Sequence, residues 1–105
     1  MNYTREIRTG YEIRTWPDGH KEWHSTYEGT CRHREDGPAV IYADGSKEWF
    51  RNNEMHRLDG PAFEDVNGER GWWIKGVLYL NEEEWLKEPE VKKALLRKKI
   101  ENILE

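Results

Sequence analysis

A histidine, an arginine and an aspartate recur at one spacing, and they are the side chains of this chain that could do chemistry. They occur at positions 33–36 and again at 56–59. An imidazole beside a carboxylate could act as a general acid or base, and a guanidinium beside them could hold a phosphate. A catalytic site needs different groups that converge on one point. Two copies of one motif should instead lie apart from each other, at equivalent places along the fold. We therefore expect no catalytic residues and no enzyme activity, and the candidates for ligand binding are His33, Arg34, His56 and Arg57.

Metal binding is the second chemistry that the residue types suggest. His20 and His24 lie in a strand-like segment, where residues four apart share a face but lie about 13 Å from each other. Cys31 is the single cysteine of the chain, whereas structural zinc sites usually have several thiolates. We expect no metal site, no cofactor and no internal disulfide, and such cysteine usage is typical of a reducing compartment.

The residues of the first motif belong to a repeat. The segment 33–39 returns as 56–62, which is 23 residues later. Each copy is followed by an aspartate or asparagine, a glycine and a tryptophan, at 44–49 and 67–72, and a third copy of this half lies upstream at 18–23. A fixed period of roughly 20–50 residues is typical of stacked supersecondary units.

Each unit is predicted to be a β-hairpin followed by a second turn. In the central unit, Asp44 and Gly45 lie between two short β-rich runs, which predicts a two-residue type I′ turn. Asn52 and Asn53 form the second turn, because asparagine tolerates left-handed backbone geometry. Residues 3–9 should add a strand that caps the open edge, since terminal repeats are usually atypical.

The pattern changes from strand to helix after Tyr79. Asn81 is a good N-cap, and Pro89 fits the first turn of a second helix that runs from about Glu90 to Leu104. We expect a mainly β fold, an antiparallel β-meander of hairpin repeats followed by a broken C-terminal α-helix. The 105 residues should form a single domain, with a capping strand at 1–10, three repeats at 11–80 and a helical segment at 81–105.

The repeated unit resembles the MORN-type repeat family, and more closely a variant with His-Arg-x-Asp-Gly-Pro-Ala units that is common in phage and bacterial proteins. Segments 33–39 and 56–62 match that unit in full, and the resemblance covers roughly residues 11–86. It implies β-meander sheets with no shared chemistry. Some bacterial relatives are antitoxin components, and MORN repeats more widely are linked to protein or lipid contact.

Composition limits the partners that the chain can have. Charged residues make up 36% of it and the net charge is −4, which argues against a general polyanion binder because phosphate contacts need clustered lysine and arginine. No apolar run approaches the roughly 18–20 residues of a membrane span, and the N-terminus has no apolar signal core. We expect a cytoplasmic protein without membrane contact. The basic helix at 90–104 could bind nucleic acid weakly, and Ile103 and Leu104 could pair with a second copy to form a homodimer.

Aromatic side chains are the other candidates for a binding surface. Trp23, Trp49 and Trp72 recur in register and should form a ladder in the core. Other aromatics fall at different positions of the repeat, and an insertion within 25–31 breaks it at a place where binding specificity often lies. The residues expected to bind a partner are Trp16, Tyr27, Glu28, Tyr42, Phe50 and Trp73. The alternative is that helix 90–104 covers this face.

These features favour a non-enzymatic protein-interaction module, borne by a phage or another mobile element. It would bind and inhibit a host protein, for example a nuclease complex of a CRISPR-type defence, in the cytoplasm of the host. Two alternatives stay open. One is a sponge for a nucleotide signal, clamped by arginine and histidine beside tryptophan. The other is an antitoxin, which a toxic gene next door would distinguish.

Overall fold

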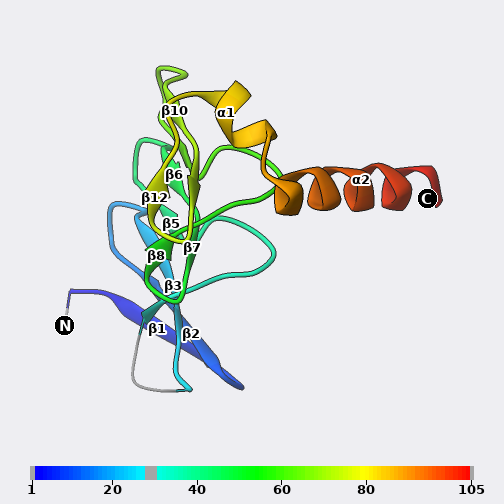
Figure 1. The fold of residues 1–105 in the computed structure, drawn as a ribbon. Coiled ribbons are helices and arrows are strands. Elements are labelled where there is room, and N and C mark those ends of the chain that lie inside the picture. Colours follow the sequence, from blue (N-terminus) through cyan, green and yellow to red (C-terminus); the bar gives the residue numbers. More distant parts are fainter. Residues whose placement is uncertain (1, 28–30, 105) are drawn as a thin grey trace.

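The computed structural model describes residues 2–27 and 31–104 (Figure 1). It confirms the mainly β prediction, because a many-stranded antiparallel sheet is followed by a C-terminal helix. Neighbours in the main sheet follow the order of the chain, and β4 (Cys31–Arg32) pairs with β3 beside this path. The path consists of β1 (Thr4–Arg8), β2 (Tyr11–Thr15), β3 (Lys21–Ser25), β5 (Val40–Ile41), β6 (Lys47–Glu48), β9 (Phe63–Glu64) and β10 (Arg70–Gly71).

Two short hairpins interrupt this path and lie outside the main sheet. One pairs β7 (Phe50–Arg51) with β8 (Glu54–Met55), and the other pairs β11 (Trp73–Ile74) with β12 (Val77–Leu78). Backbone hydrogen bonds connect β4, the first hairpin and the second hairpin. The Asn53 N–H donates to Arg32 O of β4 at 2.8 Å, and the Gly76 N–H donates to Met55 O at 2.9 Å. The hairpins therefore form a second ladder beside the main sheet.

The turn at Asp44 and Gly45 differs from the type I′ turn that we expected. Type I′ requires a positive φ at both central residues, but here only Gly45 has one, at 96°. The Gly45 N–H donates to Tyr42 O at 2.9 Å, so the glycine follows a four-residue turn as in the longer hairpin loops. The Asp44 carboxylate accepts the Ser46 N–H at 2.8 Å, which stabilises this longer form.

Positive φ at two successive residues occurs instead at the turn after Arg51 and at the turn after Ile74. Asn52 and Asn53 have φ values of 51° and 68°, and Lys75 and Gly76 have values of 50° and 80°. These pairs connect β7 to β8 and β11 to β12. Both hairpins of the second ladder thus use the geometry that matches the right-handed twist of paired strands.

The C-terminal helix is broken as predicted. α1 (Glu82–Leu86) begins after Asn81, whose side chain accepts the Glu84 N–H at 3.0 Å. α2 (Pro89–Leu104) begins at the proline, because its missing N–H has no partner in a first helical turn. Among the described residues, no helix is both long and apolar enough to cross a bilayer.

The start of α2 is buried and its remainder projects from the body of the protein (Figure 1). Val91 packs with Ile74 and Trp85 in a small apolar core. Further along the helix, Leu96 is 59% exposed and Ile103 is 73% exposed. The homodimer suggested by the apolar end of this helix stays a prediction.

The two faces of the main sheet carry different side chains. Side chains alternate between the two faces along a strand. Glu22 and Glu48 point to one face, which we call the glutamate face. The residues that follow them, Trp23 and Trp49, point to the other face, which we call the tryptophan face. Trp72, at the corresponding place in the next unit, packs against the core that holds α2. The helix therefore lies on the tryptophan face.

Candidate functional site

Arg57 is held in place by three contacts within the chain. Its guanidinium carbon lies 3.9 Å from the centre of the Trp49 ring. Its Nε donates to the Asp59 carboxylate at 2.8 Å and its Nη1 donates to Pro61 O at 3.0 Å. Stacking on an aromatic ring and bonding through a planar fork of donors are the interactions that arginine makes better than lysine.

Arg34 makes the same set of contacts one unit earlier. Its guanidinium carbon lies 4.0 Å from the centre of the Trp23 ring, and its donors reach Asp36 at 3.0 Å and Pro38 O at 3.1 Å. A Cβ at Gly37 would lie 2.9 Å from that guanidinium carbon, so a larger residue there would displace the guanidinium. The two arginines predicted to bind a ligand thus hold the turns of the repeat together.

His33 and His56 also share one structural contact. Their Nδ1 atoms accept the backbone N–H groups of Asn52 and Lys75, each at 3.0 Å. An Nδ1 that accepts carries no proton, so the proton of the neutral ring is on Nε2. This contact ties each histidine to the following hairpin turn.

The two histidines differ at Nε2. In His33 this atom lies 3.6 Å from a carboxylate oxygen of Glu35, whereas the corresponding neighbour of His56 is the apolar Leu58. His56 is only 8% exposed, and its Nε2 has no hydrogen-bond partner among the described residues. An unpaired buried donor is costly, so His56 presents an N–H in need of an acceptor.

The surroundings of His56 keep its ring neutral. Burial lowers its pKa, and the charges of Arg51 and Lys75 lower it further. Glu90 and Glu54 act in the opposite direction but do not outweigh these effects. The Nε2 atom is therefore a neutral N–H donor near neutral pH.

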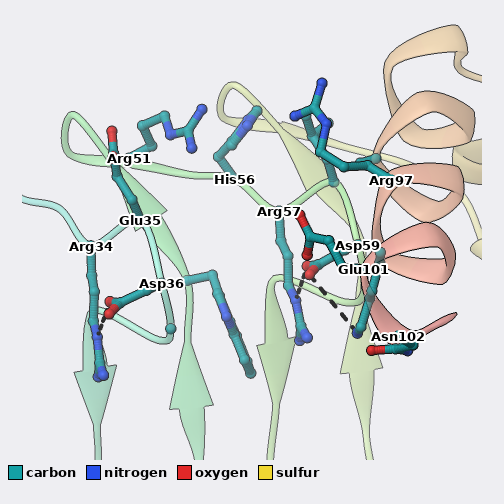
Figure 2. A pocket seen from close by; sticks show the side chains of 15 residues that line it. Arg34, Glu35, Asp36, Arg51, His56, Arg57, Asp59, Arg97, Glu101 and Asn102 are labelled. Atoms are coloured by element: carbon teal, nitrogen blue, oxygen red, sulfur yellow. Dashed lines mark hydrogen bonds and ion pairs between the residues drawn. The ribbon is translucent and has the colours of Figure 1, made fainter. Parts of the chain in front are cut away.

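A groove of about 660 Å³ lies between the turns of the repeat and α2, and His56 lines it. In Figure 2, the side chains of Arg51 from β7 and Arg97 from α2 extend toward His56 from its two sides. Neither arginine makes an ion pair within the part of the chain that the structure describes. Asp59 and Glu101 lie toward the other end of the groove, where Lys98 approaches the Asp59 carboxylate at 3.9 Å (Figure 2).

A second hollow, of about 620 Å³, lies at the inserted loop. Tyr27 lines it together with Tyr11 and Trp23, and its side chain is 80% exposed. The Tyr27 ring lies against Gly10, where a Cβ would come within 2.6 Å of the phenol oxygen. Glu28, the other residue predicted for this loop, lies outside the described residues.

Aromatic rings form a continuous row at the edge of the glutamate face. We call Tyr3, Trp16, His20 and Tyr42 the aromatic row. Successive ring centres are 4.7, 4.8 and 5.2 Å apart. The row lies on the glutamate face because the His20 Nε2 donates to Glu22 at 2.8 Å and the Tyr42 hydroxyl donates to Glu48 at 2.7 Å.

Two of the predicted partner-binding residues, Trp16 and Tyr42, thus belong to one surface. Tyr42 is 39% exposed. Burial of part of its ring and the bond to Glu48 raise the pKa of Tyr42 to about 12, so its hydroxyl keeps its proton. Helix α2 lies on the opposite face and does not cover the row, in which Tyr3, Trp16 and His20 are half-buried.

The other two predicted aromatics are placed differently. Phe50 lies beneath Arg32, whose guanidinium carbon is 5.5 Å from the ring centre. Trp73 lies over Gly71, where a Cβ would come within 2.2 Å of the indole ring. Both are half-buried and pack within the fold.

Glu22 joins two histidines, an arrangement that we did not expect from the sequence. It accepts hydrogen bonds from Nε2 of His20 and of His24, both at 2.8 Å, and Arg32 lies 3.7 Å away. Burial works to raise the pKa of Glu22, but the two hydrogen bonds and the nearby charge lower it on balance. Across residues 2–27 and 31–104, no group of three or more histidine, cysteine, aspartate or glutamate side chains could hold a metal ion.

Sequence reasoning missed Arg51 and Arg97 because they come from separate elements. Arg51 precedes an ordinary turn, and Arg97 is one of several basic residues on a helix. The available signal was the change from Glu35 to Leu58 between otherwise matching units, which removes the acidic neighbour of one histidine. Comparison of the chain with protein-family models, with curated proteins and with solved structures gives no match.

Proposed function

We propose that the chain is a non-enzymatic protein-interaction module that binds its partner through the aromatic row. The observation that carries this proposal is the row itself: four aromatic rings in tilted or edge-to-face contact, of which Tyr42 is exposed and the other three are half-buried. Tryptophan and tyrosine provide a large rigid contact area and dominate interface hot spots. Arg14, whose guanidinium carbon lies 5.2 Å from the centre of the Tyr3 ring, adds the third residue type that is enriched there.

We propose further that this module is borne by a phage or mobile element and inhibits a host defence protein in the cytoplasm. A small acidic scaffold that presents aromatic rings can block a surface of a larger partner without doing chemistry. The resemblance to MORN-type repeats supports the same class of function, since these repeats are linked to protein contact. The contacts that Arg34 and Arg57 make alike, 23 residues apart, support the assignment of the chain to repeating units.

Affinity capture of the tagged protein from a bacterial lysate, followed by mass spectrometry, tests this function. Tyr42→Ala and Trp16→Ala should each weaken binding of the recovered partner at least about tenfold, as hot-spot truncations do. Tyr11→Ala is the matched control, because Tyr11 and Tyr42 are equally exposed, at 39%, and Tyr11 lies on the tryptophan face. Binding constants should be measured with purified partner.

Two results would count against the proposal. One is the absence of any stoichiometric partner. The other is a partner whose affinity falls as much in Tyr11→Ala as in Tyr42→Ala. An antitoxin would instead be recovered with the product of a neighbouring toxic gene.

A further inference from the structure

The groove beside α2 contains a donor that the protein leaves without an acceptor. The His56 Nε2–H is buried, and its proton position is fixed because Nδ1 accepts the Lys75 N–H at 3.0 Å. Its side chain is one of those that line the groove, so a small displacement of the surrounding side chains would bring an acceptor to the buried Nε2–H from that side. Buried donors are almost always paired, so this one calls for an explanation, and an acceptor from outside the chain supplies one.

The positive charges near this donor favour an anion, because the effect of Arg51 and Lys75 on the pKa of His56 outweighs the opposite effect of Glu90 and Glu54. Arg51 and Arg97 line the same groove and reach toward His56 from two different elements (Figure 2). A cation would be repelled by two guanidinium groups, and an Nε2 that carries a proton cannot act as a metal ligand. A tetrahedral oxyanion, by contrast, offers one oxygen to the imidazole and others to the arginines.

The remainder of the groove has the opposite character. Asp59, Glu101 and Asn102 line it away from His56 and present oxygen acceptors (Figure 2). Hydroxyl or amino groups of a ligand can donate to these acceptors. The volume of about 660 Å³ is typical of a small-molecule site, which spans roughly 300–1,000 Å³.

We propose that this groove binds a nucleoside monophosphate, with its phosphate at the His56 Nε2–H between Arg51 and Arg97 and its hydroxyl and amino groups toward Asp59 and Glu101. Of the four ligand-binding residues expected from the sequence, the proposed contacts with the ligand keep His56, whereas Arg34 and Arg57 bond to other parts of the chain. It is independent of the aromatic row, which lies on the other face of the sheet. It makes specific the nucleotide-binding alternative that the sequence left open.

Calorimetric titration of the purified protein with AMP, adenosine and inorganic phosphate tests the proposal. AMP should bind, and adenosine should bind at least about tenfold more weakly because it lacks the charged group. Arg51→Gln and Arg97→Gln should each weaken AMP binding about tenfold. The matched controls are Arg70→Gln and Lys99→Gln, which remove a positive charge outside the groove and should leave AMP binding unchanged.

The imidazole resonances of His56 provide a second readout that does not depend on a variant. Addition of AMP should shift the Nε2 resonance of His56 and leave that of His33 in place. The proposal would be overturned by AMP that fails to bind, by adenosine that binds as tightly as AMP, or by control variants that weaken AMP as much as the groove variants. Inorganic phosphate that binds while AMP does not would also overturn it.

Discussion

At the scale of single residues, the repeat depends on glycines that make room for arginines. A Cβ at Gly60 would lie 2.6 Å from the guanidinium carbon of Arg57, which a real Cβ contact does not allow. Gly60 does not have a positive φ, so the requirement comes from space and not from backbone geometry. Gly60 thus leaves room for the Arg57 guanidinium over the Trp49 ring.

Gly60→Ala should lower the free energy of unfolding by about 1–3 kcal/mol, because the added methyl group displaces Arg57 from the ring. Urea denaturation measures the change. In the Arg57→Ala background the same substitution should cost much less, since the clashing group is gone. An equal cost in both backgrounds would show that the clash with Arg57 is not the cause.

The buried His56 should make stability depend on pH between about 5 and 7.5. Its pKa in the folded protein lies below the unfolded value of about 6.5, because of burial and of the charges of Arg51 and Lys75, which Glu54 and Glu90 only partly offset. A lowered pKa contributes stability above the unfolded value, and this contribution is lost as the pH falls. The free energy of unfolding without phosphate should therefore be lower at pH 5 than at pH 7.5.

Urea titrations at a series of pH values check this expectation. His56→Gln should flatten the dependence in that window, whereas His33→Gln, which leaves His56 in place, should retain it. The buried Glu12 and the half-buried Glu22 titrate below this window, because the hydrogen bonds from Arg14 and Arg5 keep the pKa of Glu12 below its ordinary value, and that of Glu22 is lowered as well. If His56→Gln kept the full dependence, another group would be its source.

At the scale of elements, each hairpin of the second ladder rests on a pair of left-handed residues. Asn52 and Asn53 suit that geometry, whereas Lys75 adopts it at a cost, with a φ of 50°. The Lys75 N–H is nevertheless needed, since it donates to the Nδ1 of His56. At position 75 the backbone N–H is needed for the bond to His56, whereas the lysine side chain makes the left-handed backbone conformation less favourable.

Lys75→Gly should raise the free energy of unfolding by about 0.5–1 kcal/mol, because glycine adopts a positive φ without strain and keeps the N–H. Lys92→Gly, in the exposed interior of α2, is the matched control and should lower it by about 1 kcal/mol. Thermal or urea denaturation of both variants shows whether each substitution raises or lowers the free energy of unfolding. A loss of stability in Lys75→Gly would contradict this reading of the turn.

The elements were predictable from the sequence to the extent that they are local. Asn81, Pro89 and the turn residues each act on their immediate neighbours, so the helix break and the hairpins could be read from the chain. The turn at Asp44 was misread because the aspartate bonds to a backbone N–H two residues on. The groove was not predictable, because it needs Arg51 and Arg97 to meet across elements far apart in the sequence.

At the scale of the whole molecule, the two candidate surfaces lie on opposite faces of the sheet. The aromatic row lies on the glutamate face near the N-terminal strands, and the groove lies on the tryptophan face beside α2. Neither shares a residue with the other. A partner protein and a small anion can therefore bind at the same time without direct competition.

The stacking of side chains on the tryptophan face ends with Trp85. Arg57 covers the Trp49 ring. The residue 23 positions after Arg57 is Leu80, which is 89% exposed and does not replace the arginine. The Trp85 ring lies 6.4 Å from the Trp72 ring and takes that place. The Trp85 Nε1 donates to Arg57 O at 3.2 Å, so it closes the last unit. Because this closure touches only the final unit, a further 23-residue unit inserted before it would lengthen the stack by two strand spacings, roughly 10 Å. The separation between the aromatic row and α2 can thus be set in steps by the number of units, without redesign of either end.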